Sequence, residues 1–100
     1  ISQARGLAGQ LNLPENKGIL FIFDGLAIRN FWMAGMKFPL DIIWISGDKI
    51  IGISDSLPPA TITDIPIYSS PGPADKVLEI NAGLSSKLGI KIGDKISFKK

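Results

Sequence analysis

The chain has 100 residues, of which 45% are hydrophobic and 20% are charged, and its formal net charge is +2. This length and composition predict one folded domain over residues 1–100, because the chain is too apolar for a disordered one and too short for two cores. It contains no cysteine and no histidine, which excludes disulfides, thiolate nucleophiles, imidazole bases and cysteine or histidine metal sites, so we expect no metal and no other cofactor.

The positive charge is concentrated near the C-terminus, but its pattern does not favour a nucleic-acid partner. The lysines of this region lack the interleaved aromatic residues of a nucleic-acid groove, and such a run is typical of a solvated face. They are Lys87, Lys91, Lys95, Lys99 and Lys100. No apolar run approaches the roughly 20 residues of a membrane span. The chain starts with Ile1 rather than Met, as a trimmed or mature product does, and its compartment and oligomeric state stay open.

The first part of the chain predicts one helix and two strands. Apolar residues recur at helical spacing through residues 2–11, which predicts a helix with Ser2 as its cap. The continuous apolar run over residues 19–23 predicts a strand covered on both faces and ended by a turn at Asp24-Gly25. A further short strand is predicted over residues 30–33.

A β-hairpin is predicted at the centre of the sequence. The apolar strand over residues 40–45 is followed by Gly47-Asp48, which can form a two-residue turn before a second apolar run. The turn predicts a register in which Ile45 lies opposite Ile50, Trp44 opposite Ile51, Ile42 opposite Ile53 and Asp41 opposite Ser54. In this register the Trp44 indole belongs to the core.

The rest of the chain predicts a long loop, two strands and a short helix. Five of the seven prolines fall within residues 57–74, so this segment is predicted as a loop with at most one short strand at 65–68. A strand over 76–80, a helix over 82–88 between an Asn81 cap and Gly89, and a strand over 94–99 follow. Together these elements predict a mainly β (α+β) fold, a small, mostly antiparallel, barrel-like rolled sheet with an N-terminal helix and one short C-terminal helix.

Several motifs give the chain a family resemblance. They are Arg5-Gly6-Leu7, the apolar run Ile19 to Phe23, Phe31-Trp32-Met33, Pro39-Leu40-Asp41, Val77-Leu78-Glu79, Ala82-Gly83 and Gly93-Asp94. In this order and spacing the chain resembles the DUF192 family of uncharacterised bacterial and archaeal proteins, also called UPF0127. Its most specific part is the Phe-Trp-Met block five residues before Pro-Leu-Asp. The resemblance implies a compact, β-rich, barrel-like domain, often behind an export signal or lipoprotein anchor, and no established activity.

The chain departs from the family pattern where the family has polar side chains. Ala8 and Gln10 stand where the family usually has methionine and a basic residue. Ala34, Gly35 and Met36 stand where it usually has lysine, asparagine and threonine. If this surface binds a ligand, we expect a different ligand or weaker binding in this protein.

Two carboxylates interrupt apolar strands and are candidates for chemistry. Asp41 and Glu79 could act as general acid and base on a glycosidic or similar bond if they lie within about 5–10 Å of each other. The structural alternative is that Asp41 accepts hydrogen bonds from a neighbouring loop or from Arg5, and that Glu79 lies on a solvated face. Arg5 is predicted as a partner of a carboxylate rather than as an oxyanion clamp.

Trp32 supplies the aromatic part of the candidate site. Its ring can stack on a sugar or a base, or it can close the end of the barrel. The leading hypothesis is a small, non-enzymatic domain that binds a small molecule or saccharide at Arg5, Trp32, Asp41 and Glu79, partly covered by the proline-rich loop. The alternatives are a carboxylate-dependent hydrolase acting on a saccharide or similar substrate, and a protein-interaction module with an exposed apolar patch.

Overall fold

The computed structural model describes residues 18–32, 38–59 and 67–97. Within them lie β1 (Gly18–Ala27), β2 (Asn30–Trp32), β3 (Leu40–Ser46), β4 (Lys49–Leu57), β5 (Ile67–Ser69), β6 (Ala74–Asn81) and the helix α1 (Leu84–Lys87). The strands form a four-stranded sheet in the order β1-β6-β3-β4 and a two-stranded sheet of β2 and β5, with antiparallel pairing throughout. The predicted helix over residues 2–11 lies outside the described residues.

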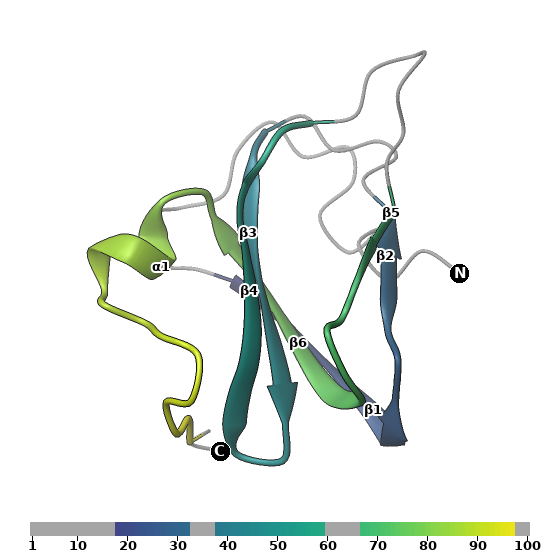
Figure 1. The fold of residues 1–100 in the computed structure, drawn as a ribbon. Coiled ribbons are helices and arrows are strands. Elements are labelled where there is room, and N and C mark those ends of the chain that lie inside the picture. The colour runs from purple at the N-terminus through teal and green to yellow at the C-terminus, as the bar shows by residue number, and fades with distance from the viewer. Residues whose placement is uncertain (1–17, 33–37, 60–66, 98–100) are drawn as a thin grey trace.

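The described strands form open sheets, with β1 and β4 at the two edges of the larger one (Figure 1). The mostly antiparallel β class is confirmed, whereas these strands do not close into a barrel. The prediction that residues 19–23 are covered on both faces is wrong, because β1 is an edge strand and the Ile22 side chain is 69% exposed. β1 also continues through Asp24-Gly25, where its pairing with β6 is irregular. In its described part the predicted strand over 94–99 has only an isolated bridge, between Lys95 and Lys49.

Both faces of β3 are buried. One face carries Leu40, Ile42 and Trp44, which pack with Phe31 of β2 and Val77 of β6. On the opposite face the buried cluster consists of Ile43, Ile45, Ile50 and Ile80, and the partly buried residues against it include Leu84, Ile90 and Ile96. Figure 1 shows the same arrangement, with β2 and β5 on one side of β3 and β4, and α1 with the C-terminal segment on the other. We call these the aromatic face and the helix face.

The β3–β4 hairpin has the predicted turn but a different register beyond it. Ile45 lies opposite Ile50 as predicted, and the Gly47 φ of 64° suits the two-residue turn. β4 then has one extra residue, so Trp44 lies opposite Gly52 and Ile42 opposite Ser54. The predicted pairs Trp44–Ile51, Ile42–Ile53 and Asp41–Ser54 are therefore wrong. At this irregularity Gly52 lies so close to Pro71 that a Cβ at this position would be 2.6 Å from the Pro71 Cγ.

Candidate functional site

Asp41 is fully buried on the helix face of β3, where its carboxylate accepts four hydrogen bonds. Its Oδ1 accepts from the Ser56 N–H at 2.8 Å and from the Gly83 N–H at 3.1 Å. Its Oδ2 accepts from the N–H and the hydroxyl of Ser85, at 3.0 and 2.6 Å. The carboxylate thereby joins β3 to the end of β4 and to the first turn of α1.

These donors decide the charge of Asp41. Burial on its own raises the pKa of a carboxyl, but the hydrogen bonds from Ser85, Ser56 and Gly83 together outweigh it and leave the pKa of Asp41 below its ordinary value of 3.8. Asp41 is therefore an ionised group whose oxygens are saturated by the fold. The prediction that it accepts hydrogen bonds from a neighbouring loop is confirmed, and Arg5 lies outside the described residues.

The backbone around α1 is adapted to this carboxylate. The residue before the helix is Gly83, with a left-handed φ of 88°, and no side chain caps the helix. The predicted Asn81 cap is therefore wrong, and the carboxylate of Asp41, supplied from another strand, bonds the free N–H groups of this turn instead. Sequence reasoning missed Ser85 and Ser56 as functional partners of Asp41, because both contacts cross between elements.

Glu79 is the opposite case, a fully buried carboxyl for which the described residues supply no hydrogen-bond partner. It lies on β6, between Ile19 of β1 and Ile42 of β3, and alternation places its side chain on the aromatic face with Val77. Within the described part of the chain neither Oε1 nor Oε2 has a hydrogen-bond partner. Burial raises the pKa of Glu79 from 4.5 to about 8. The expectation that Glu79 lies on a solvated face is therefore wrong.

The structure does not bring Asp41 and Glu79 together. Asp41 pairs with Ile80, whereas Glu79 pairs with Ile42, one residue further along. Since directly opposed residues share a face and successive residues alternate, the two carboxyls lie on opposite faces of the sheet. The predicted convergence of an acid and a base is wrong, and the reason is this register between β3 and β6.

The aromatic residues lie on the side of Glu79. Phe31 of β2 is fully buried and makes edge-to-face contacts with Phe21 and Trp44, at centroid distances of 5.3 and 5.6 Å. Trp44 is core, as predicted, and its indole N–H donates to the Ser54 hydroxyl at 2.9 Å. The backbone of Trp32 pairs with Ile67 at the end of β2, and its side chain lies outside the described part.

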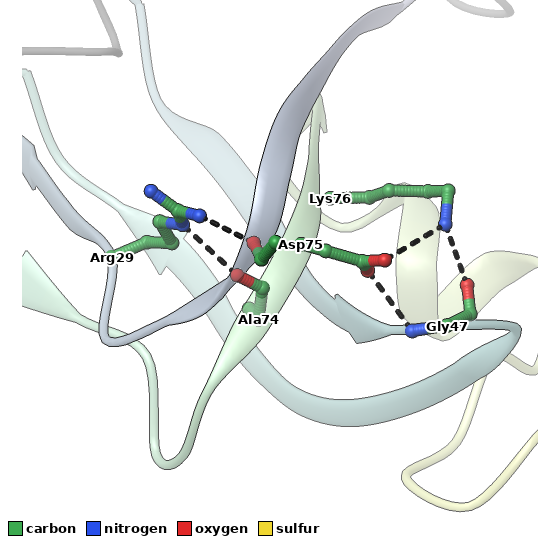
Figure 2. A network of polar contacts seen from close by, with 6 residues as sticks. Arg29, Gly47, Ala74, Asp75 and Lys76 are labelled. Atoms are coloured by element: carbon green, nitrogen blue, oxygen red, sulfur yellow. Dashed lines mark hydrogen bonds and ion pairs between the residues drawn. The ribbon is translucent and has the colours of Figure 1, made fainter.

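A polar network that sequence reasoning missed ties surface loops to β6 (Figure 2). The Arg29 guanidinium donates to Ala74 O at 2.9 Å and to Gly25 O at 2.6 Å, and it lies 4.1 Å from the centroid of the Phe23 ring. The hairpin turn is held separately, as the Gly47 N–H donates to the Asp75 carboxylate and Gly47 O accepts from the Lys76 ammonium. These contacts use backbone partners, which is typical of a structural role.

Metal-ligand clusters and membrane-spanning helices are both absent from the described residues. No group of three or more histidine, cysteine, aspartate or glutamate residues there could hold a metal ion. None of the helices in this part of the chain is long and apolar enough to cross a membrane.

The described residues form a small antiparallel β domain with two buried carboxyls, one saturated with hydrogen bonds from the fold and one with no hydrogen-bond partner among these residues. The DUF192 family, described as "Uncharacterized ACR, COG1430", matches residues 1–98, and the chain belongs to this family. A crystal structure of a protein of unknown function from Novosphingobium aromaticivorans DSM 12444 is 36% identical, with a TM-score of 0.86 over 96% of this chain and 67% of that chain. A second crystal structure is that of a "putative transcription regulator" from Sinorhizobium meliloti 1021. Its sequence is 30% identical to this chain, and the match has a TM-score of 0.84 and covers 93% of this chain and 70% of that chain. No curated protein matches the chain.

Proposed function

We propose that this protein is a small-molecule-binding domain in which the Glu79 carboxyl recognises the ligand. The observation that supports this is a fully buried side chain whose two oxygens have no hydrogen-bond partner in the described residues. Buried polar groups in proteins are paired as a rule, and an unpaired one calls for a partner such as a ligand. Arg5 and Trp32 stay predicted members of this site, whereas Asp41 has no free oxygen to offer.

The energetic cost of Glu79 supports a function beyond packing. At 1.36 kcal/mol for each pH unit between 4.5 and about 8, an ionisation that the fold suppresses lowers stability by about 5 kcal/mol at high pH. A domain of this size has a total stability of about 5–15 kcal/mol. An apolar side chain would fill the same position without this cost. Strongly perturbed carboxyls of this kind are concentrated at functional sites.

The protonation state indicates the class of ligand. With its pKa near 8, Glu79 is mostly a neutral carboxylic acid at pH 7, able to donate one hydrogen bond and to accept others. Such a group complements a neutral polar molecule with hydroxyl or amide groups, and the rings of Phe31, Trp44 and Tyr68 in the cluster on the same face of the sheet favour one with an apolar face. A saccharide combines both features, and we take it as the leading candidate.

The hydrolase alternative needs two carboxyls at one bond, and the opposite faces of Asp41 and Glu79 argue against it. Binding of a ligand without a catalysed reaction requires only the Glu79 carboxyl. The interaction-module alternative concerns a different surface, and it does not require the buried acid.

The test is an NMR titration of the labelled protein with neutral mono- and disaccharides and with simple primary amides. We expect saturable shifts of the Glu79 amide and of its partners on β1 and β3, which are lost in Glu79→Leu and weakened in Glu79→Gln. Asp55→Asn, which alters an exposed carboxylate, serves as the matched control. Binding that is unchanged in Glu79→Leu would show that the carboxyl does not recognise these molecules.

A further inference from the structure

The outer edge of β4 is paired along its first half by another segment of the chain. The Ile50 N–H donates to Asp94 O at 2.9 Å, and the Gly93 N–H donates to Ile50 O at 2.8 Å. The Ile96 N–H donates to Asp48 O at 2.7 Å. These are main-chain bonds of the kind that a neighbouring strand makes, so this edge accepts an added extended segment.

Beyond Ile50 the same strand borders an open slot of about 230 Å³, which we call the edge slot. It is lined by residues 51–54 of β4, by Trp44, by Ser69 and Pro71, and by Ile92 from the segment that follows α1. The Ile92 side chain is 66% exposed. The edge slot begins where the C-terminal segment leaves β4, and its lining is mainly apolar, with Ser54 and Ser69 as its polar side chains.

The backbone of Ile53 faces outward at this edge. Ile50 uses its N–H and C=O on the outer side, so Ile45 and Ile50 form a pair without mutual hydrogen bonds. Pairs alternate along an antiparallel ladder, and Ile43 lies two residues from Ile45 on β3, so Ile43 and Ile53 form a pair of the same kind. Ile53 thus presents one donor and one acceptor on the outer side of β4, where no described segment pairs with them.

We propose that the edge slot binds an extended, apolar peptide segment of a partner protein, which adds to β4 as the next strand. The chain's own C-terminal segment supports this occupant, since it binds the adjoining half of the same edge through main-chain bonds. The slot volume supports it too, because pockets for drug-sized molecules have about 300–1,000 Å³ and this one is smaller. A single aliphatic side chain beside Ile53 is the expected anchor.

The irregularities of β4 limit the length of the added strand. β4 has an extra residue between Ile50 and Gly52, and a second irregularity precedes Leu57, where Ser56 has a φ of 54°. Bulges of this kind shorten the edge that a foreign strand can follow, and they oppose unspecific sheet extension. We therefore expect a short contact centred on Ile53. This binding does not involve Glu79 and is separate from the proposed small-molecule site.

The test uses an acetylated and amidated peptide of alternating threonine and isoleucine with a lysine at each end, titrated into the labelled protein. Saturable shifts are expected for residues 52–54, with slower hydrogen exchange of the Ile53 amide on binding. Ile53→Pro removes the outward donor at an edge position that tolerates proline, and it should weaken binding by about tenfold. A peptide of the same composition with a central proline should not bind.

The matched pair of variants is Ile92→Lys and Ile67→Lys, which replace isoleucines that are 66% and 64% exposed, one in the slot and one on β5. Ile92→Lys should weaken peptide binding several-fold, and Ile67→Lys should leave it unchanged, so the proposal does not depend on whether Ile53→Pro folds. The proposal is overturned if the peptide causes no shifts at about 1 mM, where even a weak complex is detected. Equal binding by both variants, or a protein whose edge slots pair with each other in a dimer, would overturn it as well.

Discussion

Asp41 and Glu79 lie on adjacent central strands one residue out of register, so that their carboxyl groups face opposite sides of the same sheet. The surroundings of the two carboxyls shift their pKa values in opposite directions. Four donors hold Asp41 ionised beside α1, whereas the aromatic face surrounds Glu79 with apolar residues and raises its pKa to about 8. A sheet of a few strands thus separates a structural acid from a functional candidate.

Asp41→Asn should destabilise the fold by about 2–4 kcal/mol, because the amide NH₂ group must face two N–H or O–H donors that then lose their acceptor. Urea denaturation at pH 7 measures the loss. Asp55→Asn, at an exposed position, should change stability by less than about 0.5 kcal/mol. Equal stabilities of the two variants would contradict the structural role of Asp41.

The dependence of stability on pH in acid gives a second measure of how much the ionised Asp41 carboxylate stabilises the fold. Its folded pKa is lower than the ordinary 3.8, so its contribution is present above that pH and is lost as the pH falls through the folded pKa. The wild type should therefore lose more stability than Asp41→Asn when the pH is lowered below 3.8. Denaturant unfolding of both proteins across this range tests the difference, and parallel curves would refute it.

Glu79→Gln should abolish a loss of stability at higher pH. The folded pKa of about 8 lies above the ordinary 4.5, so the unfolded chain releases the proton first, and the wild type loses stability as the pH rises from 4.5 to about 8. Glutamine does not titrate. The free energy of unfolding of Glu79→Gln, relative to that of the wild type, should therefore increase by a few kcal/mol between pH 5 and pH 8. The test is to measure the free energy of unfolding of both proteins at these two pH values. If the difference between the two proteins were the same at both, Glu79 would not titrate as inferred.

Gly52→Ala should destabilise the protein by about 1–3 kcal/mol, because its Cβ would lie 2.6 Å from the Pro71 Cγ and 3.2 Å from the Trp44 Cδ1. Gly72→Ala is the control, as the nearest atom to its Cβ would be the Ile51 Cδ1 at 4.0 Å. Its change should be small or slightly stabilising. Thermal unfolding of both variants compares them, and an equal effect would mean that Pro71 moves away freely.

Arg29→Lys should cost about 1–2 kcal/mol, because lysine keeps the charge but cannot form the two bonds to Ala74 O and Gly25 O at once. Arg29→Met should cost at least as much, since it also removes the cation beside the Phe23 ring. Chemical denaturation ranks the three proteins. A lysine variant as stable as the wild type would show that charge alone is needed at this position.

The elements that depend on local pattern were predictable from the sequence. The run from Leu40 to Ile45 forms a strand, Gly47-Asp48 forms the turn after it, and the Trp44 indole lies in the core. The register beyond the turn was not predictable, because the residues of the turn do not specify the extra residue that β4 has between Ile50 and Gly52.

The candidate site was predictable only in its parts. Both buried acids were identified from their apolar surroundings, but their separation depends on how β3 pairs with β6, and no local pattern specifies that register. The burial of Glu79 was not predictable either, because no local pattern shows that β2 packs through Phe31 on this face of the sheet. Two of the partners of Asp41 are Gly83 and Ser85, which lie more than forty positions further along the chain.

The strand order also has a consequence for synthesis on the ribosome. β6 lies between β1 and β3 although it is the last strand to be made. The β3–β4 hairpin can form early because its two strands are adjacent in sequence, but β1 has no neighbour in the sheet until residues 74–81 emerge. A nascent chain that stalls before this point leaves the inner edge of β3 and much of its apolar surface uncovered, which makes it a substrate for chaperones.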